Sequence, residues 1–164
     1  MEQRTDDLQR SPGWHEARKN RITASAVGAI LGLSPHMTRA AVMRRMVRER
    51  EGAPAEFNGN IATDYGEANE DGAVAEYRME TGNTVELVGF ITREDWAGCS
   101  PDALIGDDGG LEAKCPFGKR KEGDLTPLAE QPHYYAQVQF SLWVTGRKFW
   151  HFYQWTAHQT KLEC

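Results

Sequence analysis

Long apolar runs are missing from this sequence of 164 residues. No stretch approaches the roughly 18–20 consecutive apolar residues that a membrane-spanning helix requires. The first ten residues, MEQRTDDLQR, are polar and lack the apolar core of a secretory signal peptide. We therefore expect a soluble, cytoplasmic protein with no membrane partner.

Cysteine is scarce and has no metal-binding spacing. The chain has three cysteines, Cys99, Cys115 and Cys164, and no CxxC pair. An odd number with this spacing argues against a disulfide scaffold, a four-cysteine zinc site and an iron–sulfur cluster. The 5 histidines show no paired ligand spacing either, so we expect no zinc. This use of cysteine fits a reducing compartment.

An excess of basic residues is also missing, since the net charge is −5. The charge is unevenly distributed: residues 53–113 carry 14 acidic and 2 basic side chains, while the rest of the chain is basic. Acidic helix faces and loops are usually only solvated. Alternatively, some of the acids converge on a divalent cation while the basic flanks meet a polyanion.

The length fits one domain, residues 1–164. Residues 1–10 are expected to form a loose, polar end. Capping residues, helical spacing and terminal glycines predict helices over 12–18, 24–31, 38–50, 61–81 and 131–144. A loop is expected at 52–60, and strands at 85–91, 97–105, 111–115 and 148–155, with a tight turn at 106–110. This order indicates an α+β fold with a small mixed central β-sheet flanked by helices.

Two carboxylates and a lysine stand out in the strand region. The turn at 106–110 would fold two segments into a hairpin and bring Asp102 close to Glu112, near enough to share one hard cation. Lys114 follows Glu112 by two residues, so both side chains lie on one face of a strand. Such a group suits phosphodiester hydrolysis, in which the cation polarises the phosphate and lowers the pKa of its water, and lysine orients or deprotonates that water. Alternating charge on a solvent-facing strand is the alternative explanation.

Four ordered segments extend this interpretation. RITAS at 21–25, CSPDAL at 99–104, LEAKCP at 111–116 and AQVQFSLWVT at 136–145 occur in the same order in one family. Through them the chain resembles phage lambda exonuclease and the YqaJ-type viral recombinase nucleases, a branch of the PD-(D/E)xK superfamily. The resemblance implies a Mg²⁺-dependent 5′→3′ exonuclease, with Mn²⁺ as a substitute, that digests double-stranded DNA ends. It also implies 3′ single-stranded tails for phage-type recombination, a single-strand annealing protein as partner, and a homotrimeric ring.

The resemblance also assigns roles to residues. Asp102 and Glu112 correspond to metal-binding carboxylates, Ala113 to a main-chain carbonyl ligand, and Lys114 to the catalytic lysine. Glu70 falls at the position of a helix glutamate beside the metal, with Glu67 as the next candidate. The family's pocket for the 5′-phosphate corresponds to Arg18, Ser25, Ser100 and Gln137. Forked arginine donors and neutral hydroxyl and amide donors suit a phosphate.

Each of these residues also has an ordinary structural explanation. Arg18 would by default be a surface arginine, Ser25 a helix cap, and Gln137 an exposed helix residue. Four tryptophans are expected in the core: Trp14, Trp143, Trp150 and Trp155. Tyr134 and Tyr135 could touch DNA, but packing on the sheet is the favoured interpretation.

The sequence departs from the family after Trp155, where lambda-type enzymes continue with a further strand and a C-terminal helix. These two elements are expected to be absent here. Two other functions therefore stay open: an endonuclease of the same superfamily, and a shortened, inactive module that binds DNA ends.

Overall fold

The computed structural model describes residues 2–5, 7–53 and 59–164. Its helices are α1 (Pro12–Arg18), α2 (Ala24–Ile30), α3 (Arg39–Arg50), α4 (Ile61–Thr81) and α5 (Pro132–Thr145), with short 3-10 turns at Phe117–Lys119 and Leu128–Glu130. All five predicted helices are confirmed to within two residues at either end. Most of the loop expected at 52–60 lies outside the described residues.

The strands form two sheets. The first has the order β1-β4-β5-β2 and contains β1 (Glu2–Arg4), β2 (Ile22–Thr23), β4 (Ile91–Arg93) and β5 (Ala97–Cys99). The second has the order β3-β6-β7-β8-β9 and contains β3 (Val85–Glu86), β6 (Ala103–Ile105), β7 (Gly109–Lys114), β8 (Phe149–Trp155) and β9 (Thr160–Glu163). Each sheet mixes parallel and antiparallel pairs, so the predicted mixed α+β class is confirmed.

Two expectations about the chain ends are wrong. Residues 2–4 are not a loose end, because β1 pairs antiparallel with β4, with Gln3 opposite Thr92. A strand also follows Trp155, because β9 pairs antiparallel with β8, with Tyr153 opposite Leu162. Both strands form by pairing with a distant or preceding strand, and neither has a strong local signal of its own.

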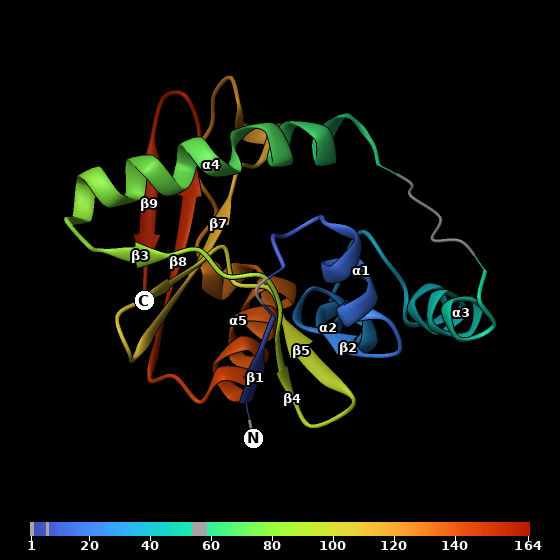
Figure 1. Ribbon diagram of the computed structural model, residues 1–164. Coiled ribbons are helices and arrows are strands. Elements are labelled where there is room, and N and C mark those ends of the chain that lie inside the picture. The colour runs from blue at the N-terminus through green and yellow to red at the C-terminus, as the bar shows by residue number, and fades with distance from the viewer. Residues whose placement is uncertain (1, 6, 54–58) are drawn as a thin grey trace.

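Two of the helices, α4 and α5, pack on the sheets. Figure 1 shows α4 running across β7 and β8, and α5 lying against β4, β5 and β8. Ala73 and Tyr77 of α4 are fully buried against Leu111 and Tyr153 of the sheet. A second core cluster joins Val144 of α5 to both sheets. None of the described helices is long and apolar enough to cross a membrane.

A close approach between two strands fixes the position of β7. A Cβ atom added to Gly110 would lie 2.3 Å from Cζ3 of Trp150 on the neighbouring strand β8. Glycine is therefore required there for the indole to pack over the start of β7. The parallel pairing of β7 with β8 continues as far as Lys114, which lies opposite Gln154, and it holds the whole strand that carries Glu112.

Candidate functional site

Glu112 is the buried centre of the site. It lies in β7 and only 3% of its surface is exposed. Its Oε1 atom accepts two hydrogen bonds: one from Nζ of Lys114 on the same strand, at 2.5 Å, and one from Nε2 of Gln137 on α5, also at 2.5 Å. The strand period of two places Lys114 and Glu112 on one face, as the sequence indicates.

Asp102 approaches the same strand from the junction between the two sheets. It lies between β5 and β6, and its main-chain amide donates to the carbonyl of Leu111 at 3.1 Å. Its Oδ2 atom accepts a hydrogen bond from the amide of Ala113 at 2.6 Å. The predicted hairpin is therefore present: β6 and β7 are antiparallel, with Ala103 opposite Leu111.

The charges of this cluster act strongly on one another. Burial, followed by the charge of Glu112, raises the pKa of Asp102 well above its ordinary value, and the charge of Glu70 adds to this effect. Burial alone lowers the pKa of Lys114, but the charges of Glu112 and Asp102 more than offset it, so the pKa is raised. Lys114 is therefore a cation at neutral pH, and the charged form of Asp102 is destabilised by burial and by the neighbouring carboxylates.

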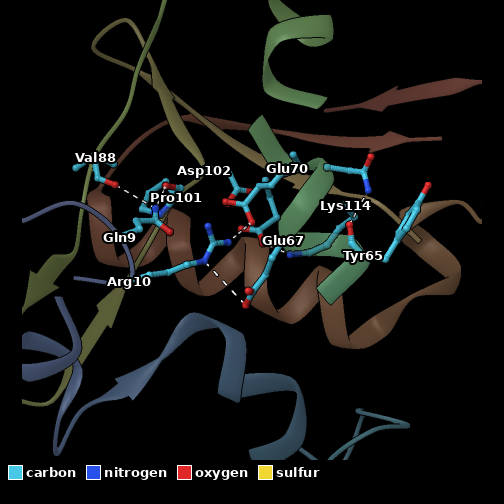
Figure 2. A network of polar contacts seen from close by, with 12 residues as sticks. Gln9, Arg10, Tyr65, Glu67, Glu70, Val88, Pro101, Asp102 and Lys114 are labelled. Carbon is cyan, nitrogen blue, oxygen red and sulfur yellow. Dashed lines mark hydrogen bonds and ion pairs between the residues drawn. The ribbon is translucent and has the colours of Figure 1, made fainter. Parts of the chain in front are cut away.

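Glu70, rather than Glu67, faces the cluster from α4. Glu70 lines a cavity of about 420 Å³ together with Asp102, and Glu67 is not part of the lining described there. Both glutamates line a second cavity of about 640 Å³, which Lys114 also lines. The Glu67 side chain is 42% exposed, compared with 25% for Glu70. Figure 2 shows Glu70 beside Asp102, and Arg10 reaching both Glu67 and Glu70.

A third cavity joins the four residues assigned to the 5′-phosphate. It has a volume of about 140 Å³ and is lined by Arg18, Ser25, Ser100 and Gln137 together with Glu112 and Lys114. These residues come from α1, α2, the β5–β6 junction, α5 and β7. The structure thus brings all four to one place, next to the acidic cluster.

The donors of this small cavity are held by specific contacts. Oγ of Ser100 accepts hydrogen bonds from NH1 of Arg18 at 3.1 Å and from Nε1 of Trp14 at 2.9 Å. The guanidinium of Arg18 also stacks on the Trp14 ring, 4.1 Å from its centroid. Burial, followed by the charge of Arg45, lowers the pKa of Arg18 to about 10, so it stays charged at neutral pH.

The ordinary explanations for these residues do not match their environment. Arg18 is not a free surface arginine, and Gln137 points at Glu112 rather than into solvent. Ser25 does not cap α2, because Thr23 occupies the N-cap position; the two hydroxyl oxygens lie 3.3 Å apart.

Trp14 and Gln9 are site residues that sequence reasoning missed. Trp14 lines the small cavity, although tryptophan was expected in the core. Gln9 belongs to the segment expected to be loose, yet its amide donates to the carbonyls of Val88 at 3.1 Å and Pro101 at 2.8 Å. A signal for Trp14 existed in its spacing from Arg18, since residues four apart meet on one helix face. Gln9 had no such local signal.

Tyr134 packs on the sheet, as the favoured interpretation predicts, and also lines a cavity. Its ring packs on Phe152 of the sheet, with the centroids 5.6 Å apart. It also lines the cavity of about 640 Å³, and Nζ of Lys114 lies 5.3 Å from its centroid. Tyr135, in contrast, is exposed.

The oxygen atoms of the cluster suit a hard divalent cation. Among the residues described, no three His, Cys, Asp or Glu side chains converge closely enough to hold a metal ion by themselves. A cation beside Asp102 and Glu112 would therefore complete its coordination with main-chain carbonyl and water oxygens, which is how Mg²⁺ is usually bound. Burial and then the charge of Glu112 raise the pKa of Asp102, and a cation at this place would favour the charged form of the carboxyl.

Comparisons with known proteins identify a family and related folds. The sequence model of the YqaJ-like viral recombinase domain matches residues 13–148. The crystal structure of an alkaline exonuclease from Laribacter hongkongensis superimposes with a TM-score of 0.76 and 29% identity, over 93% of this chain and 80% of that one. Its complex with dAMP gives a TM-score of 0.77 at the same identity and coverage.

A phage-related exonuclease from Haemophilus somnus shares the fold, with a TM-score of 0.63 and 15% identity over 83% of this chain and 68% of that one. A search of curated proteins gives no significant match.

Proposed function

Because the chain belongs to the YqaJ-like viral recombinase domain family, we propose that it is a cation-dependent nuclease that digests double-stranded DNA from its 5′ ends. One observation carries the proposal: the cavity of about 140 Å³ that joins Arg18 and Ser100 to Glu112 and Lys114. It is large enough for a phosphate group, and it places phosphate donors directly beside the acidic cluster. The likeness to an alkaline exonuclease gives further support.

In this proposal Arg18, Ser25 and Ser100 bind the terminal 5′-phosphate and thereby fix how far the strand enters. Arginine offers a forked, charged donor, and the serine hydroxyls supply neutral ones. The side-chain amide of Gln137 donates a hydrogen bond to Glu112, and Gln137 lines the same cavity, so it connects the phosphate pocket to the acidic cluster. The next phosphodiester would then lie over Asp102 and Lys114, where it is cleaved.

Asp102, Glu112 and the carbonyl of Ala113 are the proposed ligands of Mg²⁺, or of Mn²⁺ in its place. When bound, the cation supplies Lewis-acid polarisation of the scissile phosphate. Lys114 is charged and hydrogen-bonded to Glu112, which suits it to orient the attacking water and to offset charge that develops on the phosphate. Glu70 faces the same place from α4 as the fourth catalytic residue.

The wider setting is part of the proposal. Digestion from 5′ ends leaves 3′ single-stranded tails, which a single-strand annealing protein would take up for phage-type recombination in the host cytoplasm. A homotrimeric ring, with one repeated heterologous contact, would keep such an enzyme on its DNA. Light scattering at micromolar concentration should then give three times the 18.4 kDa monomer mass. A clean monomer would contradict the ring.

A digestion assay on linear and circular duplexes tests the function. We expect linear DNA to be shortened from its 5′ ends with Mg²⁺, circles to be spared, and excess EDTA to stop the reaction. Cutting of circles would instead support an endonuclease of the same superfamily. Binding of ends without any cutting would support an inactive end-binding module.

A further inference from the structure

The segment before α1 crosses the catalytic cluster and contributes a side chain that the proposed chemistry does not use. Three sets of hydrogen bonds hold this segment in place. Strand β1 pairs with β4, the amide of Thr5 donates to the carbonyl of Phe90 at 2.9 Å, and the side-chain amide of Gln9 donates to the carbonyls of Val88 and Pro101. Since Pro101 directly precedes Asp102, Gln9 fixes the segment to the backbone of the site itself.

Close packing and an unusual backbone conformation also mark this segment. A Cβ atom on Gly89 would lie 2.0 Å from the carbonyl oxygen of Asp7, so only glycine allows the chain to pass there. Arg10 has a φ of 69°, which is a strained, left-handed conformation for a residue with a side chain. Strain of this kind is retained where the surroundings hold a residue in place, often at a functional site.

The side chain of Arg10 ends on α4 at the cluster, as Figure 2 shows. Its NH2 atom lies 2.8 Å from Oε2 of Glu70, and its Nε atom lies 3.9 Å from Oε1 of Glu67. The Arg10 side chain is 45% exposed, and ion pairs at such positions add little to stability. Stability therefore does not explain why the chain holds a strained arginine at this point.

Charge gives a better explanation. Glu70 lines one cavity with Asp102 and another with Lys114, which is hydrogen-bonded to Glu112, so three carboxylates lie around the proposed cation site. Lys114 pairs with Glu112 from β7, and Arg10 pairs with Glu70 from the opposite side. The carboxylates of Glu112 and Glu70 therefore each pair with a basic side chain, whereas Asp102 accepts a hydrogen bond from a main-chain amide.

We propose that Arg10 is a positioning residue for Glu70: its guanidinium holds the Glu70 carboxylate in one orientation beside Asp102 and offsets one negative charge of the cation site. The inference rests on the proposed function, because it concerns the same cation site. Without the guanidinium, Glu70 is free to turn towards a bound cation. The cation is then held more tightly, but Glu70 no longer stands where the reaction needs it.

Mn²⁺ binding, measured by calorimetry without DNA, separates this role from a purely structural one. Arg10→Met removes the charge and keeps most of the aliphatic stem. We expect Mn²⁺ to bind roughly three- to tenfold more tightly, because one nearby positive charge is lost in a partly screened setting. Single-turnover cleavage at saturating Mn²⁺ should fall about tenfold. Arg10→Lys should restore much of both values.

Two further variants make the test specific. In a Glu70→Gln background, Arg10→Met should change Mn²⁺ affinity much less, because no carboxylate is released towards the cation and only the loss of a nearby positive charge remains. Arg4→Met is the matched control: Arg4 lies on the same segment, lines the same cavity and forms an ion pair with Glu86. Its Mn²⁺ affinity and cleavage rate should change less than about twofold.

Unchanged or weaker Mn²⁺ binding by Arg10→Met would overturn the inference, as would an equal effect in the Glu70→Gln background. A lower melting temperature with unchanged affinity and rate would make Arg10 a structural residue only. Failure of the proposed function is read separately: if the unmodified protein cuts no DNA but the Mn²⁺ affinities follow the expected pattern, Arg10 positions Glu70 in a cation-binding protein that is not a nuclease.

Discussion

The main-chain amide of Ala113 donates to Oδ2 of Asp102 at 2.6 Å, which joins β7 to the junction between the two sheets. The bond fixes one carboxylate oxygen against the strand that carries Glu112 and leaves the other oxygen without this constraint. An acidic side chain is thereby held in a place that would favour a neutral one, since the pKa of Asp102 is raised by burial and by Glu112. The arrangement is costly for folding and useful for binding a cation.

Asp102→Asn should therefore abolish cleavage and stabilise the metal-free fold. Loss of a cation ligand should lower the cleavage rate by more than about a hundredfold. Because the folded-state pKa is raised, the stability contributed by Asp102 is full below its unfolded pKa of about 3.9 and is lost as pH rises through the folded value. At neutral pH without metal, thermal unfolding should show a higher melting temperature for the variant. A lower one would mean that the charge is not the destabilising feature.

Lys114→Met tests the chemical step. The substitution keeps the stem and removes the charge that faces Glu112. We expect single-turnover cleavage to fall by about 10²–10⁴-fold, the range typical of a lost acid–base group, with DNA affinity changed less than threefold. If binding falls as much as the rate does, Lys114 is only a phosphate contact.

Ca²⁺ should bind without supporting cleavage. It is larger than Mg²⁺ and accepts a looser coordination, so Asp102 and Glu112 can hold it while the phosphate is poorly positioned. Ca²⁺ should therefore inhibit the Mg²⁺ reaction competitively, as followed in a titration of digestion rates. Full activity with Ca²⁺ alone, or in excess EDTA, would contradict a Mg²⁺ site of this kind.

Arg18→Ala tests recognition of the terminal phosphate. A hydrogen bond to a charged group is worth about 1.5–3 kcal/mol, so unmodified protein should digest 5′-phosphorylated ends roughly 10- to 100-fold faster than 5′-hydroxyl ends. The variant should lose most of this preference. Lys19→Ala is the control, because Lys19 lies next in the chain but pairs with Glu16 on the surface. Equal rates on both ends for the unmodified protein would favour the endonuclease.

The partly buried environment of His151 predicts how the free energy of unfolding responds to mild acid. Asn83 donates to the Tyr77 hydroxyl, which in turn lies 2.6 Å from Nδ1 of His151, so the network is complete when the histidine is neutral. Burial lowers the pKa of His151, and its contribution to stability is therefore full above about pH 6.5 and falls as pH drops below that value. Denaturant melts from pH 5 to 8 should show a weaker pH dependence for His151→Gln, which keeps an acceptor for the tyrosine. An identical dependence would exclude His151 as the cause.

The parts of the fold that could be predicted from the sequence are those with local chemical signals. Helix α4 begins where the side chain of Asn60 accepts hydrogen bonds from the amides of Ala62 and Thr63, and it ends where Gly82 adopts a φ of 69°. Both signals lie within a few residues of the element that they bound. The turn at 106–110 is equally local, and it was sufficient to place Asp102 beside Glu112.

The remaining features depend on distant partners. Strand β1 exists because Gln3 lies opposite Thr92, and no property of MEQRTDDLQR indicates that pairing. The choice between Glu67 and Glu70 depended on how α4 is rotated over the sheet, which Ala73 and Tyr77 determine by burying one face of the helix. Arg10 could not be found at all without the fold, because its role comes from a segment 60 residues away from Glu70.

The position of β7 in the middle of its sheet gives the two halves of the site different resistance to opening. Glu112 and Lys114 pair with Phe152 and Gln154 of β8, so their amides should exchange with solvent only when this part of the sheet comes apart. Arg18 and Ser25 belong to two seven-residue helices outside that sheet. Local fluctuations should therefore open the cavity of Arg18 and Ser25 first; under the proposed function, a DNA end would be released while the carboxylates of Asp102 and Glu112 stay in place.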